Sequence, residues 1–225
     1  MTHSVQEHFR MEVAEYDDAI RRFIPGYEEM LRRAADAVTV IQPRRVLDLG
    51  AGTAALSEQV LLRTTKAVVE LWDVDPQMLE QAAARLDGFG DRADKRIRSY
   101  YDSFPPCDAI MASLSLHHIR SIDEKQRLYA RAFDALSPGG VFVNADATLP
   151  DDERRRRARY RAWVDHMKSC GISEERAWQH FEEWSEEDTY FSEPIEVGAL
   201  EGAGFRVTVP WREVISTVVV ASKPG

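Results

Sequence analysis

The feature that most constrains the fold is a short apolar segment that runs directly into a glycine-rich turn and then into a helical pattern. Residues 45–49, Arg-Val-Leu-Asp-Leu, have the length and apolar content of a buried strand, and Gly50-Ala-Gly-Thr53 follows without a linker. Helical spacing of apolar residues resumes from Ala54 to Leu62. A strand, a glycine turn and a helix in this order predict the first unit of a parallel α/β sheet.

The same alternation continues along the chain. A second strand is expected at 67–73, and Asp75-Pro76 then supplies an N-cap and a proline at the first helical position of a helix that ends near Leu86. Further strands are expected at about 95–100, 108–112 and 141–146. A helix from about 123 to 136 should end at Ser137-Pro-Gly-Gly140. Five strands that alternate with helices predict a doubly wound parallel sheet.

The two ends of the chain depart from this alternation. Apolar residues from Val5 to Ile41, Val13 among them, recur at helical spacing, with a break at Pro25-Gly26, so two N-terminal helices are expected. A charged helical stretch covers about 151–185, and a shorter helix is expected at about 195–201. The closing strands, 204–210 and 214–221, are separated by so few residues that they should form an antiparallel hairpin.

Together these elements predict one α/β domain with a doubly wound, mostly parallel, seven-stranded sheet. Four segments are expected within it: an N-terminal helical lid (1–42), a cofactor-binding core (43–147), a helical insertion (148–192), and a C-terminal helix and hairpin (193–225). A length of 225 residues with 44% hydrophobic residues is enough for one continuous core.

Composition excludes several classes of function. A formal net charge of −9 argues against binding nucleic acid by general electrostatics, so a small-molecule partner is favoured. No signal-peptide core stands at the N-terminus and no apolar run approaches the roughly 20 residues that span a bilayer. Cys107 and Cys170 fit no zinc-ligand spacing or disulfide framework. A cytoplasmic protein without a metal site or a membrane partner is expected.

The glycine turn should lie at the ligand site, because parallel sheets bind ligands beyond the carboxyl ends of their strands. Gly50-Ala-Gly-Thr-Ala-Ala55 also satisfies the dinucleotide pattern G-x-G-x-x-A, so the turn alone leaves NAD open as a cofactor. Asp48, two residues before the turn, would favour a cationic ligand over a pyrophosphate. Asp73, at the end of the second strand, can accept hydrogen bonds from ribose hydroxyls of either cofactor.

Five segments in order resemble the motifs of the class I S-adenosylmethionine-dependent methyltransferases. They are Val46-Leu-Asp-Leu-Gly-Ala-Gly-Thr53, Trp72-Asp-Val-Asp-Pro-Gln-Met-Leu79, Cys107-Asp-Ala-Ile-Met-Ala-Ser-Leu-Ser-Leu-His-His118, Leu136-Ser-Pro-Gly-Gly140, and Ala203-Gly-Phe205 with the closing hairpin. The resemblance covers nearly the whole chain. Ile24-Pro-Gly-Tyr27 and the helical insertion are most similar to the branch that contains carboxy-S-adenosylmethionine synthase.

The resemblance implies S-adenosylmethionine as the cofactor and a role for each matching residue. It implies that Tyr27 reaches the methionine carboxylate and that Gly50, Ala51 and Gly52 cradle the methionine part. It also implies that Asp73 and Val74 bind ribose and adenine, that Asp102 and Ser103 bracket the adenine, and that Ser113 lies beside the sulfonium. In the synthase branch a C-terminal arginine holds an additional carboxylate, and residues 196–205 offer none, which favours ordinary S-adenosylmethionine.

The acceptor end is less well defined by sequence. His117 and His118 follow the fourth strand, where a neutral imidazole could take a proton from an attacking nucleophile; the alternative is that one packs and the other bonds backbone. Tyr16 is either a third candidate at this end or an ordinary core aromatic. The aromatic residues of the insertion could wall a pocket for a planar or apolar acceptor or serve as core: Trp163, Trp178, Phe181, Trp184 and Tyr190.

These observations favour transfer of a methyl group to an oxygen, nitrogen or carbon nucleophile of a small molecule. Carboxy-S-adenosylmethionine synthesis or tRNA modification, an NAD-dependent oxidoreductase, and a non-catalytic S-adenosylmethionine-binding module are the alternatives. The basic run Arg154–Arg157 is interpreted as a solvated face rather than a nucleic-acid site, because acidic residues adjoin it. A homodimer is left open.

Overall fold

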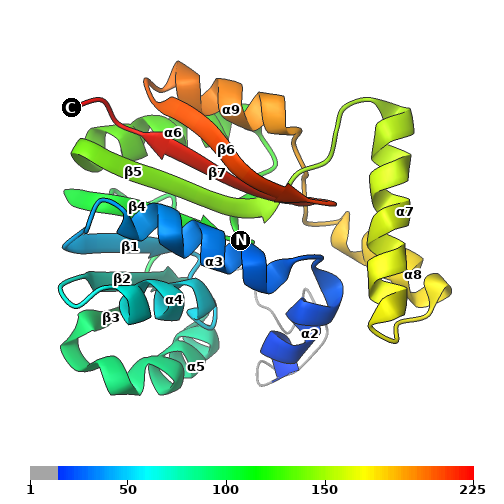
Figure 1. The fold of residues 1–225 in the computed structure, drawn as a ribbon, viewed down its shortest axis with the longest axis horizontal. Helices are drawn as coiled ribbons and strands as arrows, with labels where there is room; N and C mark the ends of the chain where they lie inside the picture. Colours follow the sequence, from blue (N-terminus) through cyan, green and yellow to red (C-terminus); the bar gives the residue numbers. More distant parts are fainter. Residues whose placement is uncertain (1–14) are drawn as a thin grey trace.

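The computed structural model describes residues 15–225 (Figure 1). The start of the predicted N-terminal helical segment, with Val5 and Val13, lies outside the described residues. Helix α2 (Tyr16–Phe23) and helix α3 (Tyr27–Thr39) follow. They are separated at Pro25-Gly26, as predicted, and Gly26 has the positive φ of 67° that favours glycine.

The sheet has the predicted seven-stranded, mostly parallel architecture. Its strands are β1 (Arg45–Leu49), β2 (Val68–Asp73), β3 (Ala93–Ile97), β4 (Cys107–Ser113), β5 (Leu136–Ala147), β6 (Arg206–Glu213) and β7 (Ser216–Ser222). They lie in the order β3-β2-β1-β4-β5-β7-β6. The strands from β1 to β5 pair in parallel, whereas β7 pairs antiparallel with both β5 and β6. The order reverses between β1 and β4, where a doubly wound sheet binds its ligand.

The starts of β3 and β5 differ from the sequence prediction. Strand β3 begins at Ala93, two residues early, because its pairing with β2 starts there with Val69. Strand β5 begins at Leu136 and includes the Ser-Pro-Gly-Gly segment, whereas the sequence predicts that this segment ends the helix and precedes the strand. Leu136 pairs with Cys107, and the amide of Gly139 donates to the carbonyl of Lys223, so this segment is bonded to its neighbours in the sheet.

Helices cover both faces of the sheet and extend past one end. The remaining helices are α4 (Ala55–Arg63), α5 (Pro76–Leu86), α6 (Ile122–Ala135), α7 (Glu153–Ser169), α8 (Glu174–Trp184) and α9 (Glu193–Gly202), with the 3₁₀ turns η2 (Asp87–Arg92) and η3 (Leu116–His118). The Asp75 side chain accepts a hydrogen bond from the amide of Gln77, which confirms the predicted cap of α5.

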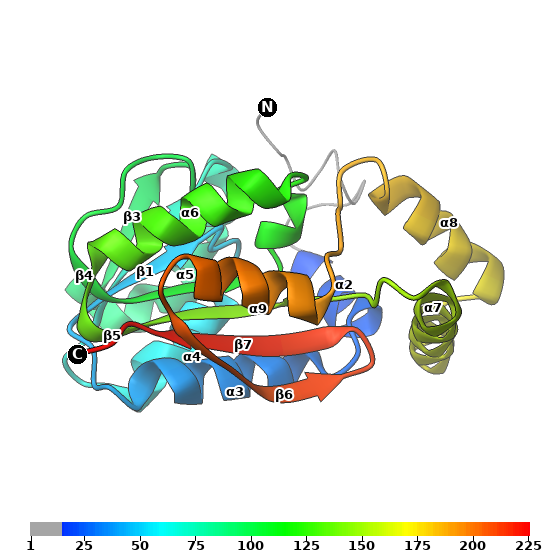
Figure 2. The ribbon, with the colours of Figure 1, turned by 90° about the horizontal axis from the view of Figure 1, so that it is seen from above.

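The core divides into two layers because successive strand residues point to opposite faces. Val46 of β1 packs with α3, α4 and α5, whereas its neighbour Leu47 packs with α6 and α9. Figure 2 shows α6 and α9 on one side of the sheet and α3 and α4 on the other. Both faces of the parallel strands are therefore buried, which explains why β1 is apolar apart from Arg45 at its start and Asp48.

Helices α2, α7 and α8 lie beyond the carboxyl ends of the parallel strands (Figure 1). The indole Nε1 of Trp163, on α7, donates to the carbonyl of Phe23 on α2 at 2.5 Å. The Arg22 guanidinium donates to the carbonyl of Cys170 at the end of α7. These bonds join the N-terminal segment to the helical insertion above the edge of the sheet where a ligand is expected.

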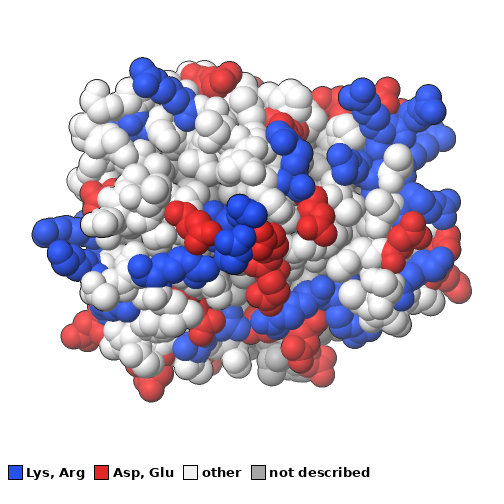
Figure 3. Space-filling model, in the orientation of Figure 1, with Lys and Arg blue, Asp and Glu red and all other residues white. Residues whose placement is uncertain are grey.

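The surface carries interspersed charges of both signs, with basic side chains gathered over α7 at the upper right of Figure 3. Arg157 pairs with Glu153 at 2.7 Å, and both side chains are largely exposed. The pairing agrees with a mixed, solvated face on this helix. Among residues 15–225, no helix has the length and apolar content needed to cross a membrane.

Candidate active site

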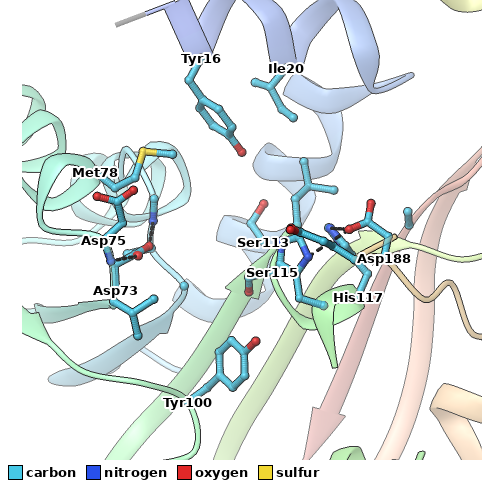
Figure 4. Close-up of a pocket in the computed structure, with 18 of the residues that line it drawn as sticks. Tyr16, Ile20, Asp73, Asp75, Met78, Tyr100, Ser113, Ser115, His117 and Asp188 are labelled. Carbon is cyan, nitrogen blue, oxygen red and sulfur yellow. Dashed lines mark hydrogen bonds and ion pairs between the residues drawn. The ribbon is translucent and has the colours of Figure 1, made fainter. Parts of the chain in front are cut away.

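A cavity of about 1050 Å³ opens at the carboxyl ends of β1, β2 and β4. Figure 4 shows Asp73, Asp75 and Met78 on one side of it and His117 and Asp188 on the other. Tyr16, from α2, and Tyr100 point into the space between them from opposite directions. The cavity therefore has two ends, one at the first two strands and one after the fourth.

The glycine turn forms the floor of the first end. The amides of Gly50 and Ala51 both donate to the carbonyl of Trp72, at 2.8 and 2.9 Å, which fixes the turn against the end of β2. Gly50 and Gly52 have φ values of 67° and 53°, a conformation that side chains disfavour. A Cβ on Gly52 would meet nothing within 4 Å, so its backbone is open to a ligand.

Asp73 connects this turn to the start of α5. One carboxylate oxygen accepts from the amide of Gly52 at 2.8 Å and the other from the amide of Asp75 at 2.9 Å. Beside it, Oδ2 of Asp75 is buried and has no hydrogen-bond partner within residues 15–225. A buried carboxylate oxygen in this state is costly unless a ligand donates to it. Asp73, Asp75 and the glycine turn therefore fit a nucleoside cofactor with several hydroxyl donors.

Asp48 is 2% exposed and faces the same end of the cavity. Burial and the negative charge of Asp73 raise its pKa, and the hydrogen bond from the Ser57 hydroxyl at 2.6 Å lowers it; the net result is a pKa of about 7. A cationic ligand would compensate this buried carboxyl, as the sequence argument expected.

Most of the predicted cofactor residues line this cavity: Tyr27, Asp48, Gly50, Ala51, Gly52, Asp73, Val74 and Ser113. Asp102 and Ser103 do not, and both are exposed. Asp102 instead accepts a hydrogen bond from the amide of Ser99, so its carboxylate closes the turn after β3. Ser99, Tyr100 and Tyr101 line the cavity in their place.

At the other end, His117 lies between two buried carboxylates. Its Nδ1 is 2.6 Å from Oδ1 of Asp146, and its Nε2 is 3.7 Å from Oδ1 of Asp188. Burial alone would lower the pKa of His117, but the negative charges of Asp146 and Asp188 outweigh it and raise the pKa to about 9. The sequence argument assumed a neutral imidazole; the structure favours the charged form at neutral pH. Asp146 and Asp188 were absent from the prediction.

Most of the other predicted acceptor-end residues also reach the cavity. Tyr16, His118, Trp163, Trp184 and Tyr190 all line it, whereas Trp178 and Phe181 do not. Trp163 and Trp184 are also almost fully buried and pack against each other, with ring centroids 5.8 Å apart. The aromatic insertion thus serves as both core and cavity wall, and Asp188, four residues after Trp184, was missed because no motif surrounds it.

A doubly wound sheet with a glycine turn after β1 and a half-buried acid at the end of β2 defines an α/β protein that binds a nucleoside cofactor. Residues 47–142 match the model of a methyltransferase domain. The chain is 29% identical over 154 residues to an uncharacterised methyltransferase of Geobacillus kaustophilus, with 68% of this chain and 67% of the relative covered. It is 25% identical over 166 residues to the carboxy-S-adenosyl-L-methionine synthase of Campylobacter curvus, with 72% and 70% covered.

Among solved structures, an O-methyltransferase family protein from Burkholderia thailandensis superimposes with a TM-score of 0.73 at 19% identity. The match covers 95% of this chain, which spans only 60% of the solved one. Residues 47–142 are therefore similar to a methyltransferase domain, and S-adenosylmethionine is the cofactor that these similarities support. This decides between the two cofactors that the glycine motif left open.

Cofactor affinity should depend on pH through Asp48. A bound cation favours the ionised carboxylate, so binding must release the proton that Asp48 carries below its pKa of about 7. We expect the affinity for S-adenosylmethionine to fall as the pH is lowered from 7.5 to 5.5, by up to about tenfold per pH unit below 7. Calorimetric titration over this range measures it. Asp48→Asn should flatten the dependence; an equally steep profile in that variant would assign it to another group.

Asp73→Ala should weaken cofactor binding about 100-fold, the effect of losing roughly 3 kcal/mol of charge-assisted hydrogen bonds. Calorimetry with S-adenosylhomocysteine gives the affinity, and a melting curve shows whether the fold survives the loss of the bonds from Gly52 and Asp75. Asp134→Ala is the matched control, because this carboxylate is exposed on α6 outside the cavity and its loss should not change the cofactor affinity. Equal affinities of the two variants for S-adenosylhomocysteine would show that Asp73 does not bind the cofactor.

Proposed function

We propose that this enzyme transfers a methyl group from S-adenosylmethionine to a nucleophile on a small molecule. The observation that carries the proposal is a single cavity that joins the Asp73 end, suited to the cofactor, to an end lined by aromatic side chains and His117. The bound cofactor supplies an electrophilic methyl group on its sulfonium. The residues of the chain have to place the acceptor in line with that methyl group and exclude water.

The walls of the second end favour a planar or apolar acceptor. Trp163, Trp184 and Tyr190 present aromatic surface to the cavity, and Ile20 and Phe23 of α2 add apolar surface. Aromatic walls with a small number of polar groups are typical of pockets that bind organic molecules of this kind. The similarity to an O-methyltransferase family protein supports an oxygen nucleophile.

Helix α2 closes the cavity from above, and we propose that it is the lid of a single methyltransferase domain. Asp17 of α2 accepts a hydrogen bond from the Thr53 hydroxyl at 2.7 Å and pairs with Arg85 on α5. Tyr16 therefore stands over the cavity on a helix tied to the cofactor turn. Its phenol keeps its proton, because burial raises its pKa well above the ordinary value, so it can donate to an acceptor oxygen.

The first test is calorimetric titration with S-adenosylmethionine, S-adenosylhomocysteine and NAD, followed by a screen of small hydroxylated and amino aromatics for transfer of a radiolabelled methyl group. We expect binding of both adenosyl compounds, no binding of NAD, and label in at least one aromatic acceptor. Binding of the cofactor without label transfer to any acceptor, and transfer to tRNA instead, would overturn the small-molecule proposal.

A carboxylated cofactor is the second candidate, because one relative is a carboxy-S-adenosyl-L-methionine synthase. The segment expected to carry its arginine, 196–205, does not line the cavity; Glu196 is instead buried and paired with Lys125. Among residues 15–225, the arginines that line the cavity are Arg98 and Arg120. Mass spectrometry of the cofactor released from freshly purified protein separates the candidates, since a carboxylated cofactor is heavier than S-adenosylmethionine.

A further inference from the structure

Three side chains at the acceptor end converge on one point. The imidazoles of His117 and His118 and the carboxylate of Asp188 each offer one atom, and these three atoms lie within 4.8 Å of one another. Nδ1 of His118 is 3.0 Å from Oδ1 of Asp188, and Nε2 of His117 is 3.7 Å from the same oxygen. Ligand atoms about 2.1 Å from a tetrahedral metal ion are about 3.4 Å apart, so these separations suit a divalent cation after small side-chain shifts.

A second layer of hydrogen bonds already orients two of the three groups. Asp146 lies 2.6 Å from Nδ1 of His117, which directs Nε2 toward the cluster. The Tyr190 hydroxyl donates to Oδ2 of Asp188 at 2.5 Å, which leaves Oδ1 facing the two imidazoles. Metal-binding histidines and carboxylates are held in this way, by a carboxylate on the second ring nitrogen and a donor on the second oxygen.

Chain connectivity also holds the cluster together. The amide of Thr189 donates to the carbonyl of His117 at 2.8 Å, so the segment after α8 is fixed directly to the turn after β4. The side chains of His117 and Asp188 are 10% and 3% exposed, and that of Asp146 is 4% exposed. Two carboxylates buried this deeply require compensating positive charge, which is supplied by a paired cation or by a metal ion.

We propose that His117, His118 and Asp188 form a binding site for a divalent transition-metal ion at the acceptor end of the cavity. Two imidazole nitrogens and one carboxylate oxygen favour Zn²⁺, Co²⁺ or Fe²⁺ over Mg²⁺ and Ca²⁺, which prefer oxygen ligands. Three protein ligands leave coordination positions open toward the cavity, where a hydroxylated acceptor could bind. With the cation bound, Nε2 of His117 is a ligand and does not act as a base.

The site is tested with chelator-treated, untagged protein and Zn²⁺ or Co²⁺ alone, without cofactor or acceptor. We expect one ion per chain by calorimetry and a visible Co²⁺ absorption band. His118→Ala and Asp188→Asn should each weaken binding at least about 100-fold, and Tyr190→Phe about 10-fold, as for the loss of an outer hydrogen bond. Mg²⁺ should not compete.

Two control variants test whether the metal ion binds at this cluster and not at other histidines. His166→Ala removes an imidazole on α7 that does not line the cavity. The double variant His3→Ala/His8→Ala removes the two imidazoles that precede the described residues. Both variants should bind the metal ion as tightly as the wild type does. Melting curves identify any variant that fails to fold. If an alanine variant fails to fold, the near-isosteric Asp188→Asn variant still tests the site. Absence of stoichiometric binding, or binding unchanged in His118→Ala and Asp188→Asn, overturns the site. The readout is independent of methyl transfer, so it stands or fails separately from the proposed function.

Discussion

Gly50→Ala is expected to abolish cofactor binding and to lower the free energy of unfolding by about 3 kcal/mol or more. The new Cβ would lie 2.5 Å from Cβ of Ser115, a separation that side-chain atoms do not reach without displacing backbone. Ser115 has little freedom to move, because it is buried and its hydroxyl donates to the carbonyl of Leu49 at 2.7 Å. The φ of 67° adds a further conformational cost for alanine.

Gly52→Ala is the matched control. Its φ of 53° carries a similar backbone cost, but a Cβ there meets no atom within 4 Å. Chemical denaturation should therefore show a loss of only about 1 kcal/mol for this variant. The double variant Gly50→Ala/Ser115→Gly removes the clashing atom and should recover part of the stability. Equal destabilisation by the two alanine substitutions would show that backbone conformation, and not the contact with Ser115, explains the glycine at position 50.

His117→Ala should lower kcat about 100-fold in chelator-treated enzyme and leave cofactor affinity within about twofold of wild type. General acid–base groups contribute between about 10² and 10⁴ to rate, and the lower value is expected here because the imidazole is mostly protonated at neutral pH. Steady-state kinetics with an acceptor found by the label screen gives kcat, and calorimetry gives the cofactor affinity.

Asp146→Asn separates the position of the imidazole from its presence. The amide retains the shape of the side chain but weakens the charge that holds Nδ1 of His117, so an intermediate kcat is expected. A His117→Ala enzyme with full kcat would assign His117 to packing, the alternative that the sequence left open. A loss of cofactor affinity equal to the loss of kcat would place His117 at the cofactor instead.

The cofactor end of the site was predictable because its parts are close in sequence. Asp48, Gly50 and Gly52 lie on one strand and its turn, and the Asp75-Pro76 cap marks the start of α5 without any tertiary information. The position of Asp73 beside the glycine turn was predictable because Asp73 ends the second strand, and the carboxyl ends of neighbouring parallel strands meet at one edge of the sheet. At this end of the cavity, the local sequence pattern and the geometry of the sheet predict the same positions for these residues.

The sequence prediction was wrong where a strand boundary or a hydrogen-bond partner depends on residues distant in the chain. Strand β3 is an exposed edge strand with little apolar pattern, so its start was misplaced by two residues. The resemblance placed Asp102 at the cofactor, whereas the nearby Ser99 and Tyr100 line the cavity. The Ser137–Gly140 segment has turn composition, yet it lies in β5 because hydrogen bonds from its neighbours are available. Turn propensity is a weak preference that tertiary hydrogen bonding overrides.

The sequence by itself determined the order of strands and helices, the glycine turn and the acids of the cofactor site, because hydrophobic period, caps and glycines act over a few residues. The tertiary structure alone decided the acceptor end. His117 meets Asp146 from β5 and Asp188 from the segment after α8, 29 and 71 residues further along the chain. These contacts depend on the order of the strands in the sheet and on where the chain after α7 and α8 packs against the sheet. No local pattern records them.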